Sequence, residues 1–154
     1  MRHPEFFIDA ARVEDIPALV DLLGTLFSIE QDFKPDPERQ TRGLSGVLDS
    51  SNACLKVARV APGKVIAMCS GQLVYSTSEG SPSVWIEDMV VDQEWRARGV
   101  GRVVLQSVLD WAMTRGATRA QLLADLDNHP ALAYYQHLGW QETRLVARRL
   151  ALQP

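Results

Sequence analysis

The fold is decided by the stretch Val90-Val91-Asp92-Gln93-Glu94-Trp95-Arg96-Ala97-Arg98-Gly99-Val100-Gly101-Arg102. Here the apolar end of a strand leads through a short polar loop into a helix. Glycines at 99 and 101 let the backbone approach a ligand closely, and the first N–H groups of a helix lack partners within the helix. Three arginines add charge to the partial positive charge of the helix start. The stretch therefore predicts an anion site that suits a diphosphate, although two glycines can also serve tight packing alone.

Outward from this turn, hydrophobic periodicity predicts alternating strands and helices along the whole chain. Upstream, the expected strands span 6–11, 53–60, 65–75 and 83–91, and the expected helices span 16–27 and 37–48. Downstream, we expect a helix at 99–115, a strand at 120–126, a helix at 130–138 and a closing strand at 144–152. The order β-α-α-β-β-β-α-β-α-β predicts a single α/β domain over residues 1–154, with a mixed sheet flanked by helices.

Composition and charge narrow the classes of function. The chain has 154 residues, 46% of them hydrophobic, and a net charge of −3, which disfavours nucleic acid as a partner. Its apolar runs are too short to cross a membrane, and the start of the sequence lacks a secretory signal, so we expect a cytoplasmic protein. Cys54 and Cys69 lack the spacing of a metal site, so they are expected to be buried free thiols and no metal is predicted.

Several common catalytic and nucleotide-binding motifs are missing. No third glycine follows Gly101 at the spacing of a dinucleotide turn, and no GxxxxGK[ST] loop is present. The three histidines have no triad partner at a recognisable spacing, and there is no Gly-x-Ser-x-Gly elbow. These observations argue against a dehydrogenase, a P-loop ATPase and a serine hydrolase.

Two segments together resemble the GNAT family of N-acetyltransferases. The acyl-coenzyme A turn of that family reads Arg/Gln-x-x-Gly-x-Gly/Ala, and residues 96–101 match it in full. Residues 128–140, which read NHPALAYYQHLGW, are similar to the family's Asn-x-x-Ala-x-x-Leu-Tyr-x-x-x-Gly-Phe segment, with Tyr134 in place of the leucine. The resemblance implies a GNAT-like, mostly antiparallel sheet and acetyl-CoA as co-substrate.

The resemblance also implies where acetyl-CoA binds. The amides of residues 98–102 would hold the diphosphate, and main-chain groups of Met89 and Val91 would pair with the pantetheine arm as an added strand. Asn128 is implied as a further contact, although an asparagine before Pro130 also suits a helix cap. The implied contact residues are Met89, Val90, Val91, Arg96, Ala97, Arg98, Gly99, Val100, Gly101, Arg102 and Asn128.

Acetyl transfer to an amine needs a base and an acid. An alkylamine is only about one part in a thousand neutral at pH 7, so a base would help. Alternation along the strand places Glu87 on the same face as Met89 and Val91, which makes it the first candidate; Asp88, on the opposite face, is the second. Both could instead be surface charges. Tyr135 occupies the family's general-acid position, where a phenol can protonate the departing thiolate, or it could simply pack in its helix.

The acceptor is less defined than the donor. Glu30 and Asp32 follow the first helix, where relatives cover the acceptor site, and would suit a cationic small-molecule amine; a solvated helix end is the alternative. Asp88 is a third candidate for binding this substrate. We therefore predict an N-acetyltransferase that modifies a primary amine of a small molecule. The rivals are a protein N-acetyltransferase, a transferase for longer acyl chains, and a CoA-binding sensor or interaction module without turnover. A homodimer remains open.

Overall fold

The computed structural model describes residues 5–29 and 34–153 of the chain. Their contacts form two compact units, Met1–Leu122 and Leu123–Pro154. The first unit holds β1 (Phe7–Ala10), α1 (Ile16–Ile29), α2 (Pro37–Asp49), β2 (Ala53–Val60), β3 (Lys64–Ser76), β4 (Ser81–Val91), α3 (Val100–Thr114) and β5 (Arg119–Leu122). The second holds α4 (His129–His137). That the two units act as one domain stays a prediction.

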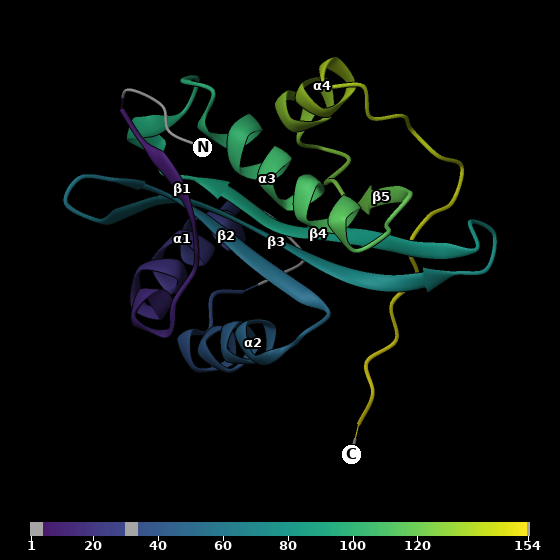
Figure 1. The fold of residues 1–154 in the computed structure, drawn as a ribbon, viewed down its shortest axis with the longest axis horizontal. Coiled ribbons are helices and arrows are strands. Elements are labelled where there is room, and N and C mark those ends of the chain that lie inside the picture. The colour runs from purple at the N-terminus through teal and green to yellow at the C-terminus, as the bar shows by residue number, and fades with distance from the viewer. Residues whose placement is uncertain (1–4, 30–33, 154) are drawn as a thin grey trace. The chain divides into compact units, whose positions relative to one another are not determined.

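A single five-stranded sheet organises the first unit, in the order β1-β2-β3-β4-β5. The first three pairings are antiparallel, and β4 pairs with β5 in parallel. Figure 1 shows α1 and α2 on one face of this sheet and α3 on the other. The predicted mixed, mostly antiparallel sheet between helices is therefore confirmed.

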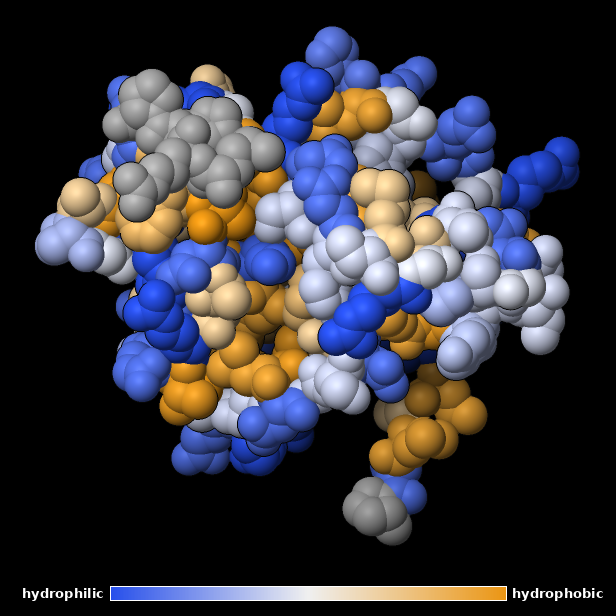
Figure 2. All heavy atoms as spheres, in the orientation of Figure 1, coloured by the Kyte–Doolittle hydropathy of each residue, from blue (hydrophilic) through white to orange (hydrophobic). Residues whose placement is uncertain are grey.

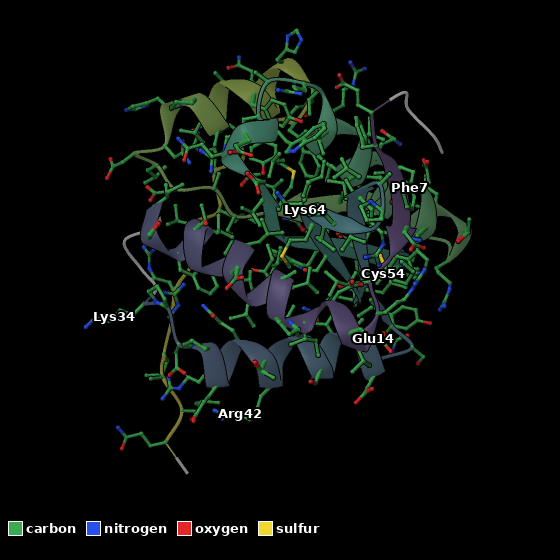
Figure 3. All side chains as sticks on the ribbon, turned by 90° about the vertical axis from the view of Figure 1, so that its left-hand side faces the viewer. Phe7, Glu14, Lys34, Arg42, Cys54 and Lys64 are labelled. Carbon is green, nitrogen blue, oxygen red and sulfur yellow. The ribbon has the colours of Figure 1, made fainter. Side chains whose placement is uncertain are left out.

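The face beneath α1 and α2 carries the larger apolar cluster. Leucines of both helices pack there on residues of β2, β3 and β4, among them Val57, Met68 and Val90. α2 begins where Pro37 follows Asp36, whose carboxylate accepts a hydrogen bond from the Arg39 N–H at 3.2 Å. In Figure 3 the two helices run side by side beneath the strands, with Glu14 beside the start of α1.

A buried ion cluster ties β1 to β2. The Arg59 guanidinium donates to both carboxylate oxygens of Asp15, at 2.7 and 2.6 Å, and to Asp9 at 3.0 Å. The side chain of Arg59 is only 7% exposed, so these bonds are shielded from water. They hold the pKa of Asp15 below its usual value. The cluster fixes the chain direction from β1 into α1.

Two predicted strands differ in the structure. β5 ends at Leu122 instead of continuing to 126, and residues 141–153 contain no helix or strand. A strand forms only where a neighbour satisfies its backbone groups, and residues 144–152 have no strand partner in the described part of the chain. Leu145, Val146, Leu150 and Leu152 are 70–88% exposed, and Figure 2 shows the stretch that leads to the C-terminus as mostly apolar. The expected closing strand is wrong.

Candidate functional site

The first unit contains an open strand edge directly before the glycine turn. β4 pairs with β3 as far as Val91, but it pairs with β5 only over residues 83–86. On the β5 side, residues 87–91 therefore have no strand partner among the described residues. A free edge of this kind offers N–H and C=O groups to an extended ligand, which can pair with it as an added strand.

A bulge in β4 creates this opening. Ser70 pairs with Glu87 and Met68 pairs with Val90, so Asp88 and Met89 together stand opposite Cys69. Asp88 has a φ of 53°, in the left-handed region that few residues other than glycine adopt. A bulge bends its strand and increases the local twist. This explains why β5 stops opposite Ile86, and hence why the predicted longer strand is not formed.

The bulge also reverses which side chains face which helices. A Cβ on Gly71 would meet Ile86 of β4 and Val108 of α3, so Ile86 faces α3. Val90, an even number of residues later, packs instead in the cluster beneath α1 and α2. Glu87 therefore faces α1 and α2, while Met89 faces α3. The expectation that Glu87 shares a face with Met89 and Val91 is wrong, because the extra residue shifts the alternation.

Main-chain groups at the end of β4 are turned toward the open edge. The Asp92 N–H donates to the carbonyl of Ile66 on β3 at 2.8 Å. Since N–H and C=O groups of successive residues point to alternate sides of a strand, those of Val91 point away from β3. The same alternation directs the groups of Met89 outward. These are the two residues whose main chain the family resemblance implies as partners of a pantetheine arm.

The turn after β4 holds two residues in left-handed conformations. A 3-10 turn at Gln93–Trp95 is capped by Asp92, whose carboxylate accepts from the Glu94 N–H at 3.0 Å. Ala97 then has a φ of 60° and Gly99 a φ of 80°. Residues 96–99 are exposed. Left-handed residues within a tight turn form a concave set of backbone N–H groups that suits an anion.

The start of α3 lacks the side-chain cap that other helices of this chain have. Gly99 precedes the helix and provides no side-chain acceptor, and the first turn contains no acidic residue. By contrast, Asp36 caps α2 and Asn128 caps α4. The first amides of α3 thus face the turn without a side-chain acceptor from the cap. Together with the helix dipole, they make the turn suitable for an anion.

The three arginines of the turn differ in what they contact. The Arg96 Nε–H donates to the carbonyl of Val91 at 3.2 Å. The Arg98 guanidinium lies 4.8 Å from the centre of the Trp95 ring and 3.9 Å from a carboxylate oxygen of Glu5. Arg102 is exposed in the first turn of α3. All three surround the turn, but two of them contact the protein itself.

Two predicted residues lie in the second unit. Tyr135 is half-buried on α4, with its ring centre 5.6 Å from that of Tyr134 and 5.9 Å from that of Trp140. The Asn128 side chain accepts a hydrogen bond from the Ala131 N–H at 3.3 Å and so caps this helix. Their roles toward acetyl-CoA stay predictions.

Of the remaining predicted residues, Glu30 and Asp32 lie outside the described residues. Glu87 is exposed, and its backbone carbonyl accepts a hydrogen bond from the hydroxyl of Ser70 at 3.0 Å. Ser70 was not predicted from the sequence, although a hydroxyl directly after the apolar run 65–69 can signal a buried hydrogen bond. This bond lies one residue before the bulge and holds Glu87 to β3.

Other kinds of site find no support in the described residues. No group of three or more potential metal ligands occurs among them. Both cysteines are free, and burial raises the pKa of Cys54 to about 11 and also raises that of Cys69. Neither is a reactive thiolate. No described helix combines the length and the apolar character needed to cross a membrane.

Known proteins are similar to this chain in sequence and in fold. The model of the acetyltransferase (GNAT) family matches residues 16–140. An aminoglycoside N(6')-acetyltransferase type 1 from Stenotrophomonas maltophilia is 29% identical over 126 residues, 78% of this chain and 81% of that protein. A ribosomal protein bS18-alanine N-acetyltransferase from Salmonella typhimurium is 33% identical over 58 residues, 38% of this chain and 39% of that protein.

Solved structures agree with this assignment at the level of the fold. The crystal structure of a possible acetyltransferase from Clostridium difficile 630 superposes with a TM-score of 0.84 and 20% sequence identity. The superposition covers 97% of this chain and 99% of that one. With a family model that spans most of the chain, the chain belongs to the GNAT family of acetyltransferases and is an acyltransferase.

Proposed function

We propose that this protein transfers an acetyl group from acetyl-CoA to a primary amine of a small cationic molecule. The observation that carries the proposal is the continuity of the open β4 edge with the uncapped start of α3. An extended arm that pairs with Met89 and Val91 would lead directly to the amides of residues 98–102. One end of this path suits a strand-like amide chain, and the other suits a diphosphate.

The chemistry assigns separate tasks to the strand edge and to two side chains. The amine nitrogen forms a bond to the thioester carbonyl carbon, and the bond from that carbon to sulfur breaks. A backbone N–H near Val91 donates to the carbonyl oxygen as negative charge develops. Glu87, directly or through a water molecule, takes a proton from the amine, and Tyr135 returns one to the sulfur.

The corrected position of Glu87 supports its assignment as the base. Glu87 and the main-chain groups of Met89 and Val91 belong to one strand segment, but the Glu87 side chain faces α1 and α2. In this proposal, acetyl-CoA binds along the open edge of β4, while the Glu87 side chain leaves the same strand toward α1 and α2. An amine that enters from the α1 and α2 face would reach Glu87.

An aminoglycoside is the acceptor that the comparisons favour. The Stenotrophomonas maltophilia relative is named for the aminoglycoside 6'-amine and aligns over most of both chains. The rival protein N-acetyltransferase rests on a relative of which this chain covers 39%. A cytoplasmic location and a homodimer remain predictions beside this proposal.

Calorimetric binding of CoA and thiol release from acetyl-CoA test the proposal together. The acceptor panel should contain an aminoglycoside with a 6'-amine, a matched one with a 6'-hydroxyl, spermidine, and a peptide with an N-terminal alanine. We expect turnover with the 6'-amine and not with the 6'-hydroxyl. Peptide turnover alone would replace the small-molecule acceptor by a protein, and CoA binding without any release would favour the sensor.

A variant of Glu87 tests the base separately. Glu87→Gln should lower turnover at neutral pH by about 100-fold, within the range typical of general bases, while the affinity for CoA stays unchanged. The loss should shrink as the pH rises toward the pKa of the amine, because more of the acceptor is then neutral. A loss that is equal at all pH values would exclude Glu87 as the base.

A further inference from the structure

The side chain of Arg96 is bound to the backbone of the strand that precedes it. Its Nε–H donates to the carbonyl of Val91, five residues earlier, at 3.2 Å. That carbonyl points away from β3, into the open edge of β4. Arg96 therefore bridges the last residue of the strand and the beginning of the turn.

This bond completes a clamp around one peptide group. The carbonyl of Val91 and the N–H of Asp92 belong to the same planar unit. The N–H donates to the carbonyl of Ile66 at 2.8 Å, and the carbonyl accepts from Arg96. Because the peptide is held on both sides, the end of β4 cannot rotate without breaking a hydrogen bond.

We propose that Arg96 is a positioning residue, whose Nε–H fixes the Val91 peptide so that the strand edge and the amides of the turn stay aligned. This proposal rests on the proposed function. With its carbonyl taken by Arg96, Val91 presents its N–H to the ligand. Arg96 acts on acetyl-CoA through the backbone and not through its charge.

The other two arginines provide the contrast that this proposal needs. Arg98 stacks on Trp95 and approaches Glu5, so it is held to the turn and to the N-terminal region. Arg102 makes no hydrogen bond or ion pair with the part of the chain that the structure describes, and it lies in the first turn of α3. Of the three, Arg102 is therefore the one that no such contact holds to the described part of the protein.

Two substitutions separate a backbone donor from a positive charge. In Arg96→Gln the amide nitrogen occupies the place of the arginine Nε, so the donor to Val91 remains and the charge is lost. In Arg96→Lys the charge remains, but a methylene group takes the place of Nε. Arg96→Met has neither.

The experiment measures CoA affinity and backbone amide resonances in these three variants. If Arg96 positions the peptide, Lys and Met should weaken CoA binding by about tenfold, as expected for one lost hydrogen bond, while Gln should stay within about threefold of the parent. In the absence of CoA, the Asp92 amide resonance should move in Lys and Met and stay near its place in Gln. Retained affinity in Lys with a loss in Gln would overturn the proposal.

A matched control and a second outcome keep the two proposals apart. Arg115 also donates to a backbone carbonyl, that of Ser51 at 3.1 Å, but at the opposite end of α3. Arg115→Gln should leave both CoA affinity and the Asp92 resonance unchanged. If the parent protein binds no CoA, the proposed function fails, whereas the Asp92 resonance still shows whether Arg96 holds Val91. An unmoved Asp92 resonance in Arg96→Met would refute the positioning role alone.

Discussion

Gly71→Ala tests how tightly α3 is seated on the sheet. A Cβ at this position would lie 2.5 Å from Cγ1 of Val108 and 3.0 Å from Cγ2 of Val84. Carbon atoms in favourable contact are about 3.5–4.0 Å apart, so Val108 would have to retreat by about 1 Å. Val108 is fully buried, so its retreat would press on the side chains packed around it. Overpacking of this kind costs about 2 kcal/mol, which corresponds to a fall in Tm of about 4–8 °C.

Thermal and urea unfolding of a double-mutant cycle measures this clash. Val108→Ala alone should destabilise the protein through the cavity that it leaves, but it removes the methyl group that the new Cβ meets. The Gly71→Ala/Val108→Ala protein should therefore be more stable than the sum of the two single effects predicts, by about 1 kcal/mol or more. Gly46→Ala on α2 is the control, since a Cβ there has no atom within 4 Å. An additive cycle, or equal effects at Gly71 and Gly46, would refute this account of the packing.

Three further changes test the site and the ion cluster. Tyr135→Phe should lower turnover with little change in CoA affinity, and wild-type turnover at neutral pH would remove the phenol from the mechanism. Gly101→Glu should abolish CoA binding measured by calorimetry, because its carboxylate repels a diphosphate; unchanged affinity would place the site elsewhere. Arg59→Met should cost about 3 kcal/mol in urea unfolding at neutral pH, since it leaves two carboxylates without their buried partner. Folding lowers the pKa of Asp15, so the ionised carboxylate stabilises the protein at pH values above its ordinary pKa of 3.8. This stabilisation is lost as the pH falls through the lower pKa of the folded state. Asp15→Asn should therefore flatten the fall in the free energy of unfolding between pH 5 and pH 2, and an unchanged slope would contradict this.

The sequence predicted the helices and the central strands because their hydrophobic patterns are long and the residues that begin and end them are adjacent in the chain. The apolar face of α3 repeats through Val104, Val108 and Ala112, and Gly116 follows at the C-terminal end with a φ of 85°. The glycine turn could be predicted for the same reason, because its glycines indicate the backbone conformations that the turn requires. Family membership followed from that turn and from residues 128–140.

The missing closing strand marks a limit of such patterns. Residues 144–152 have the composition of a strand, but composition describes a fit to a half-buried surface and does not supply the neighbour. Strand pairing is decided by which edges remain open and by where they lie. The local sequence of residues 144–152 contains no information on which strand edges remain open or where they lie. An apolar segment without a partner and a paired strand therefore have the same local pattern.

The bulge at Asp88 is the feature that the sequence concealed and on which the site depends. Nothing in the residue type of Asp88, between Glu87 and Met89, indicates a left-handed conformation. A prediction that alternates side chains between the two faces of the strand therefore passes through Asp88 without a shift. Yet this one extra residue lies where β4 leaves β5, and it places the side chains of Glu87 and Met89 on opposite faces of the sheet. It also directs the outward main chain of Met89 and Val91 into the opening. The same distortion thus accompanies the open edge at Met89 and Val91 and separates their face from that of Glu87, so a regular β4 would remove both features at once.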